Sequence, residues 1–444
     1  MLNVSQAVEI AARAVEAARR AGADAADAGV TADQSTGVGV RLGHVEDIDR
    51  SEGESLSLRA FVGRRVASVS SSRMGAEDLD RLAERVVAMA RAAPEDPWAG
   101  LAPEQRLLSG NAPDLDLHDG RHVEPDALRD MALAIEDAAR AVAGVTNSEG
   151  AGASAREAVS ALATSHGFAA GYRTTNYSAS AAVIAGTGER MQNGHASHSA
   201  RYLQQLDHAG EIGQRAAMRA VERLDPVKVP SGPMTIVFDP RVSASLVNHF
   251  AAAISGPAVA RGTSFLKDRL GKRVFGNAVA IHDDPHRPRG LRSRPFDGEG
   301  LPMSPVALIE HGVLQTWLLD SATARQLALE PTGHGARGGG VSTSNLYLAA
   351  GATPRETLLG EVTRGLYVTE LIGQGVNGVT GDYSRGAAGF LIENGECIRP
   401  VAGVTIAGNL IDMFAALTPA SDLTFRYGVN APTVRVDGMT VAGD

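Results

Sequence analysis

The chain has 444 residues, a formal net charge of −9 and 44% hydrophobic residues. This length predicts about two or three domains of ordinary size. An acidic chain lacks the clustered basic face that binds nucleic acid, which argues against a nucleic-acid partner. The one basic cluster, residues 287–294, is predicted to be a solvated or salt-bridged loop.

Membrane and export signals are not found in the sequence. No run of about 18 apolar residues could cross a membrane, and the first residues lack the basic-then-apolar pattern of a signal peptide. The single cysteine, Cys397, cannot form an intrachain disulfide and is expected to be a small core residue. We therefore expect a cytoplasmic protein with no membrane partner.

The first half of the chain alternates helical and strand patterns. Alternation of period two predicts strands up to Val69 and a strand region over 151–186, and residues 94–124 are predicted to be a long connection. Apolar residues at helical spacing predict four helices, over residues 4–18, 79–90, 128–142 and 211–224.

The stretch DPVKVPSGP, residues 225–233, is the best candidate for a domain boundary, since it has three prolines and no periodicity. Beyond one more helix near residues 242–254, short strands separated by glycines predict a large, mainly antiparallel β domain. The predicted fold class is α+β, with N-terminal α/β units before that domain. We expect helix-and-strand units at 1–110 and 111–228 and a β-rich domain at 229–444.

Motifs for metal binding and nucleophilic catalysis are weak. There is no HExxH motif, and two closely spaced histidine pairs, His195 with His198 and His282 with His286, are expected to be surface residues rather than ligands. There is also no GxSxG motif. The Gly-rich loop 333–345 lacks the Gly-Lys-Ser/Thr ending of a phosphate-binding loop, so it is predicted to border a cleft or to be a plain loop.

The segment GDYSRGAAGFLIENGE, residues 381–396, is unusually polar. Asp382 and Ser384 would share one face of a strand. No histidine lies nearby in the sequence to activate the serine. These residue patterns alone assign no reaction to the segment. A turn held by an Asp382–Arg385 salt bridge explains it as well as a binding site does.

The chain resembles the TldD/PmbA family, and specifically its PmbA (TldE) branch. The resemblance covers nearly the whole length and rests on several long segments in the expected order. They include FDPRVSASL (238–246), RGTSFLKDRLGKRVF (261–275), GLRSRPFDGEG (290–300), LLDSATARQL (318–327), GLYVTELIGQGVNGVTGDYSRGAAGF (365–390) and TIAGNLIDMF (405–414).

The resemblance implies a cytosolic zinc-dependent peptidase made of two related subunits, TldD and TldE, which form a heterodimer around an enclosed cleft. Such peptidases degrade unfolded peptides and mature peptide natural products by removing leaders. The TldD subunit carries HExxxH on a helix and a later zinc-binding cysteine. Both branches share an RGTS segment shortly after that helix. In this sequence the RGTS segment begins at Arg261.

Counting back from Arg261 places the two zinc histidines on Val247 and Ala252 and the general base on Asn248. None of these side chains can bind zinc or act as the base, and no cysteine lies between residues 417 and 431. We therefore expect no catalytic residue and no metal ligand in this chain. His249, in the same window, is expected to be packed or hydrogen-bonded to a neighbour.

The favoured hypothesis is a non-catalytic subunit that forms part of a peptide cleft beside a TldD-like partner, which would hold the zinc. An extended peptide would bind by strand addition to a Gly-rich sheet edge. One alternative is a free-standing, homodimeric peptide-binding or adaptor protein; a weaker one is a hydrolase active through its own zinc or Ser384. The predicted substrate-binding residues are His334, Arg337, Asp382, Ser384, Arg385 and Asn394.

Overall fold

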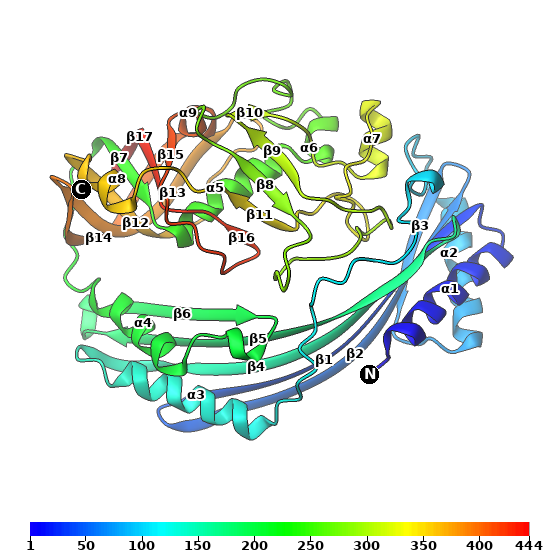
Figure 1. The fold of residues 1–444 in the computed structure, drawn as a ribbon, viewed down its shortest axis with the longest axis horizontal. Coiled ribbons are helices and arrows are strands. Elements are labelled where there is room, and N and C mark those ends of the chain that lie inside the picture. Colours follow the sequence, from blue (N-terminus) through cyan, green and yellow to red (C-terminus); the bar gives the residue numbers. More distant parts are fainter. Residues whose placement is uncertain (444) are drawn as a thin grey trace.

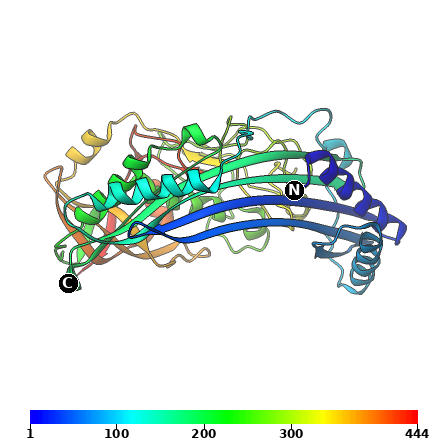
Figure 2. The same ribbon diagram turned by 90° about the horizontal axis from the view of Figure 1, so that it is seen from below.

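Two layers from different halves of the chain face each other in the computed structural model, which describes residues 1–443 (Figure 1). The lower layer is a six-stranded antiparallel sheet with the strand order β3-β2-β1-β4-β5-β6. Its four central strands have 17 to 20 residues each, which is long for a globular protein, and the sheet is curved (Figure 2). The strands are β1 (Ala25–Arg41), β2 (His44–Val62), β3 (Arg65–Ser71), β4 (Val145–Thr164), β5 (Ala169–Ala185) and β6 (Gln192–Ala200).

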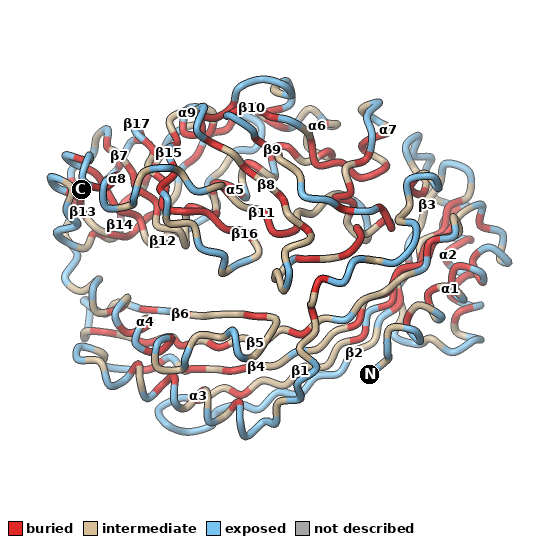
Figure 3. The backbone as a smooth tube through the Cα atoms, viewed as in Figure 1, coloured by how far each residue is buried: buried red, intermediate tan, exposed pale blue. Residues whose placement is uncertain are grey.

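Four helices cover one face of this sheet. On β4, Ala153 packs with α3 and α4, whereas Val159 and Ala161 pack with α1 and α2. Successive strand residues point to opposite faces, so the even-numbered residues of β4 beyond the bulge at Gly150 lie on the face without helices. Figure 3 shows the same alternation of burial along β5. The helices are α1 (Val4–Arg20), α2 (Ala76–Ala92), α3 (Pro125–Arg140) and α4 (Ala209–Val221), with short 3-10 turns η1 (Glu104–Arg106), η2 (Gly188–Arg190) and η3 (Leu203–Gln205).

The two N-terminal helix-and-strand units share this sheet. Strand β1 pairs with β4 from Asp27↔Thr164 to Val40↔Ala151, so the strands of residues 1–110 and 111–228 are hydrogen-bonded to each other. The long antiparallel hairpins match the predicted period-two patterns, and a tight turn at Gly63 and Arg64 joins β2 to β3. The exact unit boundaries stay a prediction.

The C-terminal half contains two further sheets, with orders β10-β9-β8-β11-β16 and β14-β13-β12-β7-β17-β15. The second closes on itself because β14 also pairs with β17. Most pairings are antiparallel, as predicted for the α+β class; β7–β12 and β11–β16 are parallel. The elements are β7 (Gly232–Phe238), α5 (Pro240–Ala253), α6 (Gly256–Ala260), β8 (Ile281–Asp284), β9 (Val306–Glu310), β10 (Val313–Leu314), α7 (Ser321–Leu327), β11 (Asn345–Leu348), α8 (Arg355–Gly360), β12 (Arg364–Ile372), β13 (Asp382–Glu393), β14 (Glu396–Asn409), α9 (Leu410–Ala415), β15 (Leu417–Pro419), β16 (Val429–Asn430) and β17 (Val434–Ala442).

One large hydrophobic core lies in this half, and it includes the apolar face of α5. The prediction that Cys397 belongs to a core is wrong, because its side chain is exposed near the tip of the β13–β14 hairpin. Residues at such a tip extend past the packed layer, so a strand pattern alone does not place them inside. Across residues 1–443, every helix is too short or too polar to span a lipid bilayer.

Candidate functional site

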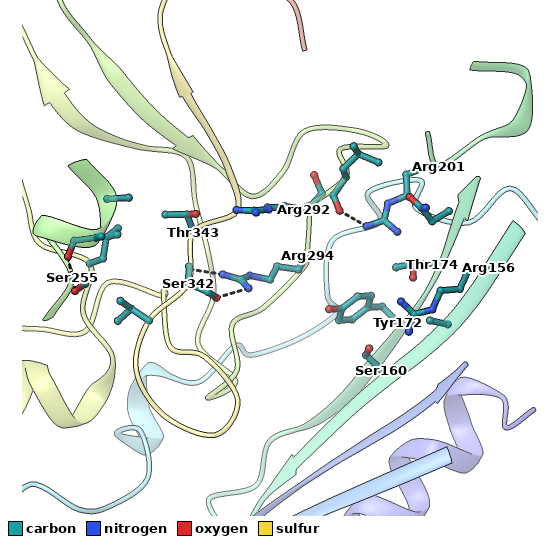
Figure 4. A pocket seen from close by; sticks show the side chains of 18 residues that line it. Arg156, Ser160, Tyr172, Thr174, Arg201, Ser255, Arg292, Arg294, Ser342 and Thr343 are labelled. Atoms are coloured by element: carbon teal, nitrogen blue, oxygen red, sulfur yellow. Dashed lines mark hydrogen bonds between the residues drawn. The ribbon is translucent and has the colours of Figure 1, made fainter. Parts of the chain in front are cut away.

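A cavity of about 800 Å³ lies between the open face of the N-terminal sheet and the C-terminal half. Its floor consists of three directly opposed pairs of residues from β4 and β5, which are Ser160↔Tyr172, Ala158↔Thr174 and Arg156↔Asn176. All six are even-numbered and thus lie on the face that the helices leave uncovered. The floor therefore presents hydroxyl, amide and guanidinium groups toward the C-terminal half (Figure 4).

Helix α5 supplies one wall of the cavity. Asp239 caps the helix by accepting a hydrogen bond from the backbone N–H of Arg241 at 3.0 Å, and Pro240 occupies the first turn, where no amide donor is needed. Val247 is buried in the C-terminal core. On another face, Ala252 and Ser255 line the cavity, and Asn248 is exposed one turn before Ala252.

The loop 290–294 supplies the opposite wall and is held by residues from distant parts of the chain. The guanidinium of Arg201 donates to the carbonyls of Gly290 at 3.4 Å and Leu291 at 2.6 Å. The side chain of Asn345 accepts from the backbone N–H of Arg292 at 3.0 Å and donates to the hydroxyl of Ser293 at 2.8 Å. These bonds fix the direction in which Arg292 and Arg294 leave the loop.

Figure 4 shows Arg292 and Arg294 extending from this loop toward Thr343 and Ser342. Arg294 donates to the hydroxyl of Ser342 at 2.9 Å and to its carbonyl at 2.7 Å. The prediction of a solvated or salt-bridged loop at 287–294 holds for Arg289, which pairs with Asp116 at 2.6 Å. It misses the cavity-lining role of Arg292 and Arg294, because that role depends on the distant sheet.

Further cavities extend this one along the boundary between the two halves. A cavity of about 240 Å³ shares Ser160, Tyr172, Arg294 and Ser342 with it. A cavity of about 300 Å³ shares Arg201 and Leu291. The latter shares Arg426, Tyr427 and Asn430 with a cavity of about 730 Å³ beside α4. Together they form a groove, which we call the cleft.

Beside the smallest cavity lies a buried carboxyl pair, Glu299 and Asp297. Burial, together with the charge of Asp297, raises the pKa of Glu299 to about 7. Glu299 accepts from the backbone N–H of Ser321 at 2.9 Å and from its hydroxyl at 2.8 Å. Burial also raises the pKa of Asp297. The pair holds the start of α7 and the Gly-rich loop in place.

Of the residues predicted to bind substrate, two belong to that Gly-rich loop. His334 is buried, and its ring nitrogens lie 2.9 Å from the Thr332 hydroxyl and 3.2 Å from the Asp283 carboxylate. Arg337 lines the smallest cavity and contacts the carboxylate of Asp27, and it donates to the carbonyl of Ser57 at 2.9 Å. Arg337 is therefore at the cleft, where it ties the loop to the sheet.

The other four, in β13 and its turn, lie elsewhere. None of the cavities in the cleft is lined by Asp382, Ser384, Arg385 or Asn394. Asp382 accepts from the hydroxyl of Thr380 at 2.6 Å and from Asn409 at 3.1 Å, rather than from Arg385. These bonds lower the pKa of Asp382.

Asp382 and Ser384 do share the exposed face of β13, as expected, with buried Tyr383 between them. Asn394 and Gly395 form the hairpin turn with φ values of 50° and 86°, the pattern of a tight Asn-Gly turn. A role of this segment in substrate binding stays a prediction.

Comparison with known proteins assigns the chain to a family. Three models match, described as PmbA/TldA metallopeptidase domain 1 over residues 26–90, the central domain over 118–224 and the C-terminal domain over 231–443. The chain is 36% identical to Metalloprotease PmbA of Escherichia coli O157:H7, over 95% of this chain and 92% of that protein. It belongs to the PmbA/TldD metallopeptidase family.

Two further similarities agree with this assignment. The Metalloprotease PmbA homolog of Haemophilus influenzae is 35% identical over 97% of this chain and 95% of its own length, so the chain falls in the PmbA branch. The crystal structure of TldE from Thermococcus kodakarensis matches with a TM-score of 0.85 over 97% of this chain and 99% of that chain. At 21% identity this last match concerns the fold alone. The family supports a peptidase-related role.

A metallopeptidase family implies a metal, and the residues of α5 do not fit one. Val247 and Ala252 carry no donor atom, and the exposed amide of Asn248 is no general base. Among residues 1–443, no group of three or more His, Cys, Asp or Glu side chains converges in a way that could hold a metal ion. His195 and His198 are three residues apart on strand β6 and so point to opposite faces.

His249 packs edge-on against Tyr383, with ring centroids 6.1 Å apart. This contact agrees with the expectation of a packed side chain. Burial, together with the charge of Arg385, lowers the pKa of His249.

Proposed function

We propose that this chain is the non-catalytic, cleft-forming subunit of a TldD/TldE-type zinc metallopeptidase that acts on unfolded or extended peptides in the cytoplasm. The observation that carries the proposal is the cleft-facing side of α5. Ala251 and Ala252 of α5, and Ser255 just after its end, line a large polar cavity there. They include no metal ligand and no general base, and Asn248, one turn before Ala252, is an exposed amide. A zinc-bearing, TldD-like partner then supplies the chemistry, in a heterodimer.

The cleft suits an extended chain better than a compact ligand. Its cavities follow one another along the sheet, and the floor of the largest offers hydroxyl and amide groups at the two-residue spacing of a strand. Such groups bond to the main chain of a peptide without reading its side chains, which suits proteolysis and leader removal from peptides of varied sequence.

Strand addition at the sheet edge next to the C-terminal half is partly blocked. The carbonyls of Asn193 and His195 on edge strand β6 already accept hydrogen bonds from Arg223 at 3.3 Å and Arg219 at 2.7 Å, both from the α4 segment. We therefore place the peptide over the faces of β4 and β5 rather than along the edge of β6.

Co-expression with an HExxxH-bearing relative tests the proposal. We expect the two chains to elute together, zinc analysis to find one ion per heterodimer, and cleavage of an unstructured peptide to need both chains. Mutation of the partner's glutamate should abolish cleavage. Separate elution together with a fully active partner alone would refute the subunit role, and favour the free-standing binding protein. Stoichiometric zinc in this chain alone would favour the independent hydrolase.

A further inference from the structure

Positive charge in the largest cavity is only partly neutralised by the protein. Its lining contains four arginines and no aspartate or glutamate, although the whole chain has a net charge of −9. Arg156 pairs with Asp33 at 3.4 Å. Among residues 1–443, the other three, Arg201, Arg292 and Arg294, form no ion pair with a carboxylate.

The side chains of two of these three, Arg201 and Arg294, bond to neutral groups. Arg201 is partly buried and donates to the carbonyls of Thr175, Gly290 and Leu291. Burial lowers its pKa, as expected where no anion compensates the charge. Arg294 donates to the hydroxyl and to the carbonyl of Ser342. Carbonyl and hydroxyl dipoles orient a guanidinium but leave its full charge.

The acidic side chain of Asp297 is close enough to feel the charge of Arg294, but it forms no ion pair with it. Asp297 lines the adjacent small cavity. Its oxygens accept from the backbone N–H groups of Glu299, Leu301 and Gly335, each at 2.9 Å. The cavity therefore holds several donors with net positive charge and no internal anion.

We propose that this cavity binds a carboxylate group of the peptide, through the guanidinium groups of Arg292 and Arg294. This inference rests on the proposed function and adds a substrate preference to it. A guanidinium offers parallel N–H donors that match the two oxygens of a carboxylate. Arg201 acts as a positioning residue, since it fixes the loop that carries the other two. The carboxylate is either the C-terminus of the peptide or an acidic side chain.

The volume of the cavity agrees with this assignment. About 800 Å³ lies within the usual range of ligand sites, ~300–1,000 Å³, so a carboxylate and its neighbouring residues fit together. The hydroxyl groups of Ser160 and Thr174 on the floor remain available for the main chain of those neighbours.

Calorimetric titration of the full chain with three acetylated peptides of otherwise identical sequence tests the proposal. One is amidated with no acidic residue, one has a free C-terminus, and one is amidated with a single Gln→Glu change. We expect the peptide without a carboxylate to bind about ten-fold more weakly than at least one of the others. The peptide that regains affinity identifies the source of the carboxylate.

Variants of the cavity separate this effect from general binding. Arg292 is exposed, so Arg292→Gln should leave the fold intact and remove most of the ten-fold difference. Arg294→Gln should do the same. The control is Arg85→Gln, which removes an exposed arginine from α2, on the helix-covered side of the sheet, and should retain the difference. Added salt should weaken only the peptides that carry a carboxylate.

Two results would overturn the inference. Equal affinity for all three peptides refutes the carboxylate site and leaves the peptide-binding role standing. A difference that survives both Arg292→Gln and Arg294→Gln refutes the assigned residues. If no peptide binds either the chain alone or its complex with the zinc-bearing partner, the proposed function fails together with the inference.

Discussion

Three arginines in the middle of the cleft differ from four arginines at its two ends. At one end, Asp27 faces Arg59 and Arg337. At the other, Asp207 faces Arg215 and Arg426. In the cavity between them, the side chains of Arg201 and Arg294 bond to carbonyl, hydroxyl and thioether groups, and Arg292, like them, forms no ion pair with a carboxylate among residues 1–443.

The difference separates structural arginines from available ones. Paired arginines join segments from distant parts of the chain, as Arg337 does with the N-terminal sheet. Unpaired arginines around a cavity keep their charge for a ligand. Residue type does not distinguish the two roles, whereas the presence or absence of a carboxylate partner does.

The largest expected effect comes from removing the carboxylate at a paired end. Asp27 is 1% exposed, so Asp27→Asn leaves two mostly buried guanidinium groups without their counter-charge. We expect the free energy of unfolding to fall by about 3 kcal/mol, as for other broken buried pairs, measured by urea denaturation. Asp80→Asn, in the exposed pair with Arg20, is the control and should change little. Equal effects of both substitutions would contradict the comparison.

The buried carboxyl pair beside the cleft, Asp297 and Glu299, is the opposite case, because two acidic groups lie together there. It gives a prediction about the pH dependence of stability. With a folded pKa of about 7 against 4.5 when unfolded, Glu299 binds its proton more tightly in the folded state. Its ionisation therefore lowers stability as the pH rises from about 4.5 to about 7. Glu299→Gln can keep the bonds from Ser321 and should flatten that decline.

At pH 8 we expect Glu299→Gln to be more stable than wild type, by on the order of 2 kcal/mol. At pH 4 the difference should be much smaller, because the carboxyl is then protonated in both states. Urea denaturation at the two pH values measures this. A stability difference that is independent of pH would show that the pKa of Glu299 is the same in the folded and unfolded states.

The smallest expected effect on stability is that of Arg292→Gln, in the middle of the cleft. Arg292 is exposed and faces no carboxylate, so its substitution leaves no buried charge without a partner. The free energy of unfolding should therefore stay within about 0.5 kcal/mol of wild type. Thermal unfolding checks this. A loss as large as that of Asp27→Asn would place Arg292 with the structural arginines.

Much of the fold could be predicted from local patterns. The helices over residues 4–18, 79–90, 128–142 and 211–224 correspond to α1 to α4, because amphipathic periodicity reports directly on which face of an element is buried. The α+β class with a mainly antiparallel C-terminal half also follows from such patterns. Cys397 was misplaced because strand periodicity does not show where a hairpin leaves the core.

The candidate site was only partly predictable. Loop 333–345 was singled out for its glycines, and Arg337 does line the cleft, while His334 is buried between Thr332 and Asp283. The segment around Asp382 was predicted to bind substrate because it is unusually polar. In the structure, Asp382 accepts a hydrogen bond from Thr380, two residues away in the same turn. Arg292 and Arg294 stood in a noticeable basic cluster, but nothing in the sequence near them indicated a cavity.

By itself, the sequence determined which chemical groups this chain can offer. It places valine, asparagine and alanine on α5 at the positions where the catalytic relatives are expected to carry histidine and glutamate. Only the tertiary structure decided which groups meet. Arg201 reaches Leu291 across 90 residues of sequence, and Arg337 reaches Asp27 across 310. Such contacts depend on how the long sheet faces the C-terminal half, which no local periodicity encodes.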